Sequence, residues 1–120
     1  MNTASLELCK TLHELSGWDD TYHYYDADDV VDEKAHAMFM SRDKNCPAYD
    51  AGYLLRKLPK YIDKKHWLYL QPISYIVWAA GYKDTENAKF DPDAWANTPE
   101  DALCKLAIEL FKQGVLKGEV

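Results

Sequence analysis

The sequence predicts an α+β fold in which a small antiparallel β-sheet packs against N-terminal, central and C-terminal helices. Apolar residues recur at helical spacing near both ends of the chain, and two runs rich in aromatic and β-branched residues lie between them. Cap and turn residues separate these parts. At 120 residues, with 48% hydrophobic and 28% charged residues, the chain suits a single domain, residues 1–120, built around one core.

The first predicted helix covers residues 3–16. Thr3 or Ser5 can accept hydrogen bonds from its first backbone N–H groups, and Gly17 supplies a left-handed residue after its last turn. One apolar stripe at helical spacing is formed by Leu8, Cys9, Leu12 and Leu15. His13 lies near the C-terminal end, where an imidazolium favours the helix dipole.

The next part of the chain is less regular. Residues 18–47 follow no clear period, and within them 28–40 has features of both a short helix and a strand. A second helix is predicted over residues 48–57, and Pro59 ends it because proline disfavours a helical residue before it. The side chains spaced for burial are those of Tyr49, Tyr53, Leu54 and Leu58.

The strongest strand signal comes from residues 66–71 and 74–80. Pro72 lies between these two runs and Gly81 follows the second, so an antiparallel hairpin is predicted, with one face packed on helices. A third short strand is predicted at residues 89–97.

The last predicted helix covers residues 99–113. Thr98 is its expected N-cap, and Pro99 takes the first helical position, where a missing N–H costs nothing. Asp101 is expected to reach back to the cap as the acidic half of a capping box. Gly114 is expected to end the helix. The expected buried stripe is Leu103, Leu106, Ala107, Leu110 and Phe111.

Three motifs follow one another along this framework. Gly17-Trp18 ends the first helix, PAYDAGYLLRKLP occupies 47–59, and Trp78-Ala79 is followed by ANTPEDALCKLAIEL at 96–110. In this order they resemble the phage ABA-sandwich domain family of small phage and prophage proteins. The resemblance implies an α+β fold and a phage or prophage origin, and it carries over no catalytic residues. Residues 19–46 depart from the family pattern and form a variable acidic and aromatic segment.

Composition and charge indicate which partners and which cellular compartment to expect. The net charge of −6 argues against nucleic acid as a partner, because such binders usually carry a basic surplus. The longest apolar run, residues 75–80, is far too short to cross a membrane. The opening residues have no basic flank followed by an apolar block, so no secretory signal is expected. Three cysteines without a CxxC spacing indicate reduced thiols. We therefore expect a protein of the bacterial cytoplasm, with Cys9 and Cys104 in its core.

Charge is unevenly distributed. Residues 19–33 carry seven acids and no base, whereas residues 42–65 carry seven bases and three acids. Either one segment contacts the other, or each offers a face of opposite sign to a partner. The basic residues that trim the end of the second helix and the turn beyond it are expected to be solvated; they are Arg56, Lys57, Lys60, Lys64 and Lys65.

The segment WDDTYHYYDADD, residues 18–29, raises the question of a metal site. If residues 28–40 are helical, Asp29, Glu33 and His36 lie on one face. A second half-site is missing, however, and a calcium loop counted from Asp26 has Val31 where glycine is required and Ala37 where glutamate is required. A metal- or nucleotide-binding protein using the acids and histidines of residues 19–36 therefore stays the alternative.

Recognition of a protein partner is the main functional prediction. Tyrosine and tryptophan give rigid contact area, and the carboxylates beside them could imitate a phosphate backbone. The candidate partner-binding residues are Trp18, Asp19, Asp20, Tyr22, Tyr24, Tyr25, Asp26, Asp28 and Asp29. The sequence has no nucleophile elbow and no glycine-rich phosphate loop, so no catalytic residue and no cofactor is predicted. We expect a non-enzymatic phage- or prophage-type accessory protein that binds a host or phage protein.

Overall fold

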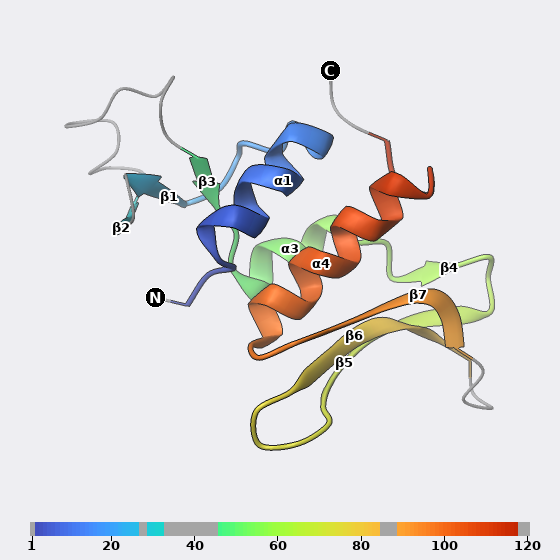
Figure 1. Ribbon diagram of the computed structural model, residues 1–120. Helices are drawn as coiled ribbons and strands as arrows, with labels where there is room; N and C mark the ends of the chain where they lie inside the picture. The colour runs from blue at the N-terminus through green and yellow to red at the C-terminus, as the bar shows by residue number, and fades with distance from the viewer. Residues whose placement is uncertain (1, 27–28, 33–45, 85–88, 118–120) are drawn as a thin grey trace.

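The computed structural model describes residues 2–26, 29–32, 46–84 and 89–117. Over these ranges the chain forms three α-helices and two antiparallel sheets, so the predicted α+β class is confirmed. One sheet has three strands in the order β2-β1-β3, and the other has four in the order β4-β5-β6-β7. Helices α1 and α4 pack side by side, with the small sheet beside α1 and the large sheet along α4 (Figure 1).

Helix α1, Leu6–Ser16, has the caps that its sequence predicts. Ser5 Oγ accepts a hydrogen bond from the Leu8 N–H, and Gly17 has a φ of 70°. The helix begins three residues later than predicted because Ser5 is the cap. Thr3 instead pairs its hydroxyl with Tyr25 Oη at 3.1 Å.

The small sheet joins segments that the sequence left undefined. Strand β1 (His23–Asp26) pairs with β2 (Asp29–Asp32) on one side and with β3 (Cys46–Ala48) on the other. Residues 29–32, within the region predicted as either helix or strand, are therefore strand; residues 33–40 lie outside the described ranges.

Helix α3 is shorter than predicted. It covers Ala51–Lys57, and Asp50 caps it by accepting a hydrogen bond from the Tyr53 N–H at 2.7 Å. Ala48, the predicted first helical residue, belongs to β3. Tyr49 lies between the two elements and is fully buried, as its spacing predicted.

The large sheet contains the predicted hairpin and third strand. Its strands are β4 (Tyr61–Ile62), β5 (His66–Pro72), β6 (Trp78–Lys83) and β7 (Lys89–Ala96). The second hairpin strand begins at residue 78, four residues later than predicted, because the Ile73 N–H donates to Val77 O at 2.8 Å and closes a loop. It then continues through Gly81, where the sequence predicted its end.

Helix α4, Pro99–Lys112, begins at the predicted cap. Thr98 Oγ1 accepts a hydrogen bond from the Asp101 N–H at 3.1 Å. The capping-box prediction for the Asp101 side chain is wrong: its Oδ1 accepts from the Ser5 N–H at 2.7 Å, and so joins the starts of α4 and α1. Gly114, with a φ of 79°, follows the end of the helix.

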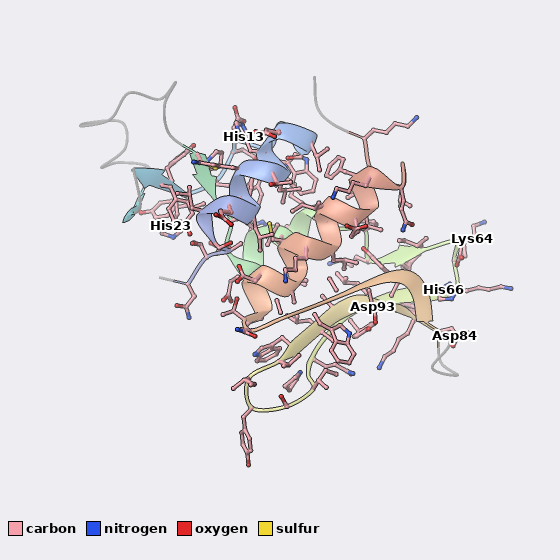
Figure 2. All side chains as sticks on the ribbon, viewed as in Figure 1. His13, His23, Lys64, His66, Asp84 and Asp93 are labelled. Carbon is pink, nitrogen blue, oxygen red and sulfur yellow. The ribbon has the colours of Figure 1, made fainter. Side chains whose placement is uncertain are left out.

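The three described histidines come from separate parts of the fold. His13 lies on α1, His23 on β1 and His66 at the start of β5, near the end of the large sheet (Figure 2). Their imidazoles therefore do not converge on one site.

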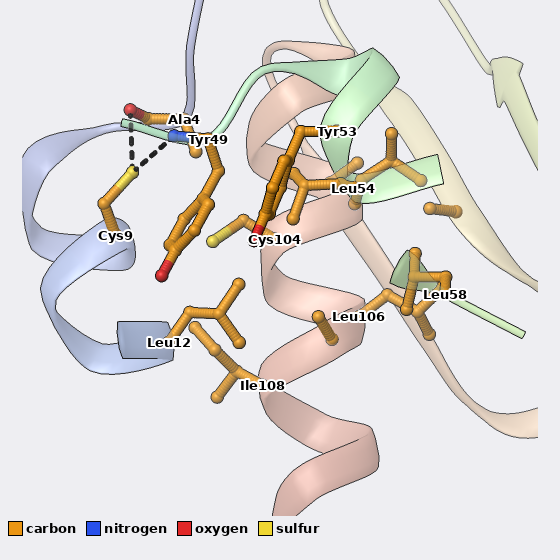
Figure 3. Close-up of a cluster of buried hydrophobic side chains, with 14 of the residues drawn as sticks. Ala4, Cys9, Leu12, Tyr49, Tyr53, Leu54, Leu58, Cys104, Leu106 and Ile108 are labelled. Atoms are coloured by element: carbon orange, nitrogen blue, oxygen red, sulfur yellow. Dashed lines mark hydrogen bonds between the residues drawn. The ribbon is translucent and has the colours of Figure 1, made fainter. Parts of the chain in front are cut away.

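The core lies between α1, α3, α4 and the inner face of the large sheet (Figure 3). Cys9 of α1 and Cys104 of α4 are fully buried there, as predicted, and the Tyr49 and Tyr53 rings stack at 5.4 Å. The Tyr49 hydroxyl donates to Trp18 O at 2.6 Å, which satisfies a polar group that would be costly to bury alone. Among the described residues, no helix is long and apolar enough to cross a membrane.

Candidate interaction surface

Trp18, the first residue of the predicted partner-binding set, belongs to the core. It is 4% exposed, and its ring packs edge-on against Phe111 at 5.3 Å and Tyr53 at 6.4 Å. Lys57 Nζ lies 5.6 Å from the centre of the same ring. A side chain held in this way joins the segment to α3 and α4, and it offers little surface to a partner.

The tyrosines of this segment divide between core and surface. Tyr25 is 8% exposed, and its hydroxyl donates to Ala4 O at 2.6 Å. Tyr24 is half-buried and its hydroxyl donates to Asp19 O at 3.0 Å. Tyr22 is 59% exposed. Tyr22 is therefore the tyrosine of the set with most of its ring free for a partner.

Asp20 is where the acidic and basic segments meet. Its Oδ1 accepts a hydrogen bond from the Tyr53 hydroxyl at 2.5 Å and lies 3.3 Å from Lys57 Nζ. The Tyr53 hydroxyl, with a smaller contribution from Lys57, holds the pKa of this carboxyl below its usual range. At this point one segment does contact the other. Asp19 is exposed.

The remaining acidic candidates are only partly described. Asp28, Glu33 and His36 lie outside the described residues, and only the backbone of Asp26 and Asp29 is described. The metal-site hypothesis thus stays a prediction. Within the described ranges, no group of three or more His, Cys, Asp or Glu side chains is placed to hold a metal ion.

The large sheet has one face that no described helix covers. Leu68 and Leu70 of β5 pack on the core, so their neighbours Trp67 and Tyr69 must point to the opposite side, because strand side chains alternate. We call this opposite side the outer face. Tyr61 and Lys83 pair with Trp67 in the strand register, and Gly81 pairs with Tyr69, so these residues lie on the outer face as well. On β7, which pairs with β6, Trp95 lies on the same face.

Exposed aromatic rings line both ends of the outer face. At the β4–β5 end, Tyr61 is 54% and Trp67 56% exposed, with ring centres 5.5 Å apart. Together with Lys64 they line an open hollow of about 330 Å³. On β7, Trp95 is 51% exposed, and its indole N–H donates to Asp93 at 3.3 Å.

Between these rings, Gly81 allows a close approach of neighbouring strands. A Cβ at this position would lie 2.9 Å from Asp93 Cβ and 3.0 Å from Tyr69 Cε1. The Tyr69 ring carries Lys83 Nζ at 4.9 Å from its centre. Packing therefore requires glycine at this position. The sequence predicted only that Gly81 follows the strand, and did not predict this close contact.

The loop between β5 and β6, residues 73–77, is the most exposed apolar part of the described chain. We call it the hairpin tip. Tyr75 is fully exposed, Ile76 is 70% and Ile73 is 42% exposed. The tip extends away from the helices (Figure 1), and the chain carries no charged residue from 71 to 82. Sequence reasoning missed this surface because its residues have the composition of a buried strand.

The turn between β4 and β5 is strained. Asp63 and Lys64 have φ values of 53° and 69°, a left-handed conformation that is uncommon for lysine. Asp63 Oδ1 accepts from the Lys65 N–H at 3.2 Å and lies 2.9 Å from His66 Nδ1. The contact with His66 lowers the pKa of the Asp63 carboxyl. These bonds hold the turn, and the Lys64 side chain lines the hollow beside Trp67.

No protein-family model matches the chain, and neither a curated protein nor a solved structure shows significant similarity to it. The relation to the phage ABA-sandwich domain family therefore rests on the three sequence motifs and stays a prediction.

Proposed function

We propose that the protein is a non-enzymatic, phage- or prophage-type accessory protein that binds a host or phage protein through its hairpin tip. The observation that carries this proposal is the exposure of Ile73, Tyr75 and Ile76 on a loop without charge. Burying a large apolar side chain at an interface contributes about 1.5–3 kcal/mol of favourable binding free energy. These three side chains are therefore suited to anchor a protein contact.

The tip supports this role better than the acidic segment of residues 18–29. Trp18 and Tyr25 of that segment are buried in the core. Asp20 already contacts the Tyr53 hydroxyl and the Lys57 ammonium group. Tyr75, by contrast, is fully exposed. An exposed aromatic ring with exposed isoleucines one residue after it and two residues before it is typical of residues that fill a pocket on a partner.

The test is an affinity pull-down from bacterial lysate with three forms of the protein. Tyr75→Ser with Ile76→Ser removes the anchor, and Tyr22→Ser with Asp19→Asn alters the acidic segment to a matched extent. Both pairs are exposed, so thermal unfolding should be close to that of the unchanged protein.

We expect the tip variant to lose the captured protein and the segment variant to retain it. Retention by the tip variant would refute the proposed surface. Loss by the segment variant alone would return the binding role to residues 18–29.

A further inference from the structure

The β4–β5 end of the outer face differs from the hairpin tip in having both rings and cations. Tyr61 and Trp67 expose more than half of their surface, and Lys64 lines the hollow between them. The two rings contact each other, and more than half of each residue stays open to solvent. A ligand with a flat ring and a negative charge would match these groups.

The cations here are available to such a ligand. Asp63, the nearest acid in sequence, is engaged by the Lys65 N–H and His66. Among the described residues, no carboxylate forms an ion pair with the side chains of Lys60, Lys64 or Lys65. Lys64 has a left-handed backbone conformation that is unfavourable for lysine, in a turn that places its side chain at the hollow.

Further rings continue from the hollow across the same face. Tyr69 follows Trp67 on the outer side of β5, about 6.6 Å farther along the strand. The Tyr69 hydroxyl is buried and Lys83 covers its ring, so the ring open to solvent beyond it is that of Trp95 on β7. A sheet face that exposes aromatic rings beside a lysine is an arrangement on which unpaired bases stack.

We propose that the outer face binds single-stranded nucleic acid, with a base stacked on Trp67 and Tyr61 and a phosphate paired with Lys64. A duplex does not fit this site, because its bases are already stacked on one another. The net charge of −6 opposes any polyanion, so stacking supplies most of the affinity and few phosphates are neutralised. This site is separate from the hairpin tip and does not depend on the function proposed for it.

The test is fluorescence anisotropy of labelled oligothymidylate and oligouridylate titrated with the purified protein at two salt concentrations. Trp67→Ala should weaken binding at least about five-fold, the loss of about 1 kcal/mol of stacking, whereas Trp67→Phe should keep most of the affinity. Lys64→Ala should weaken binding and reduce the slope of log K against log salt by about one. Tyr75→Ala, which removes an exposed ring from the tip, is the matched control and should bind normally.

Several outcomes would overturn the proposal. These are the absence of binding to either oligomer, unchanged binding by Trp67→Ala, or a duplex that binds as tightly as the single strand. Thymidine monophosphate that displaces the oligomer at an equal nucleotide concentration would assign the site to free nucleotides instead. Loss of a captured protein by Trp67→Ala, without loss of nucleic acid, would make this face a protein interface.

Discussion

Gly81→Ala should destabilise the protein although it adds a single methyl group to a strand. The new Cβ would lie 2.9 Å from Asp93 Cβ and 3.0 Å from Tyr69 Cε1, against an ordinary carbon–carbon contact of about 3.5–4.0 Å. Asp93 Cβ is attached directly to the backbone of β7, which is held to β6 by the sheet, so it cannot rotate away. Overpacking of this kind costs about 1–3 kcal/mol, offset by about 0.5–1 kcal/mol because alanine loses less conformational freedom than glycine.

The net expectation is a loss of about 1–2 kcal/mol in the free energy of unfolding, or roughly 3–10 °C in Tm for a domain of this size. Urea and thermal unfolding followed by circular dichroism measure it. Gly52→Ala is the matched control, since its Cβ would meet Asp50 Oδ1 at 3.4 Å and Arg56 Nη1 at 3.8 Å. In helix α3 that change should stabilise by up to about 1 kcal/mol. If the Gly81→Ala protein is as stable as the Gly52→Ala protein, the argument that β7 lies too close to β6 at Gly81 to admit a Cβ is refuted.

Three further predictions concern polar groups and thiols. Asp101→Ala should lower the free energy of unfolding by about 1–2 kcal/mol in urea titrations, since it removes the acceptor of the Ser5 N–H. Asp20→Asn should lower stability at neutral pH by less than about 1 kcal/mol because the side chain is largely exposed. The lowered pKa of Asp20 stabilises the fold above the unfolded pKa and this effect is lost as the pH falls through the folded pKa, so unfolding curves of the two proteins should coincide in strong acid. Cys9, Cys46 and Cys104 are buried, and burial raises the pKa of Cys46 to about 12; a thiol reagent at mildly alkaline pH should label all three only after unfolding.

The helices at the two ends of the chain were predictable because their signals are local. The caps Ser5, Gly17 and Thr98 each act within one turn of their helix, so the sequence alone predicts their roles. The partner of the Asp101 carboxylate was not predictable, because Ser5 is 96 positions away and only tertiary packing brings the two together.

The hairpin tip was hidden for a different reason. Ile73, Tyr75 and Ile76 have high strand propensity, and no glycine or asparagine marks the loop. The loop is set by the hydrogen bond from Ile73 to Val77, which no composition signal announces. The same ambiguity affected residues 18–29, where aromatic residues suited core and surface equally well. The structure assigns Trp18 to the first and Tyr22 to the second.

The hydrogen bond between the Ser5 N–H and Asp101 Oδ1 bears on the order in which the parts of the chain can fold. Helix α1 is synthesised first, yet its start is joined to α4, and Leu12 and Cys9 are buried in a core to which α4 contributes heavily. During translation the first helix must therefore wait for nearly the whole chain before its apolar stripe is covered. A chain interrupted before α4 would leave that stripe exposed and would be a target for chaperones and proteases, not a folded fragment.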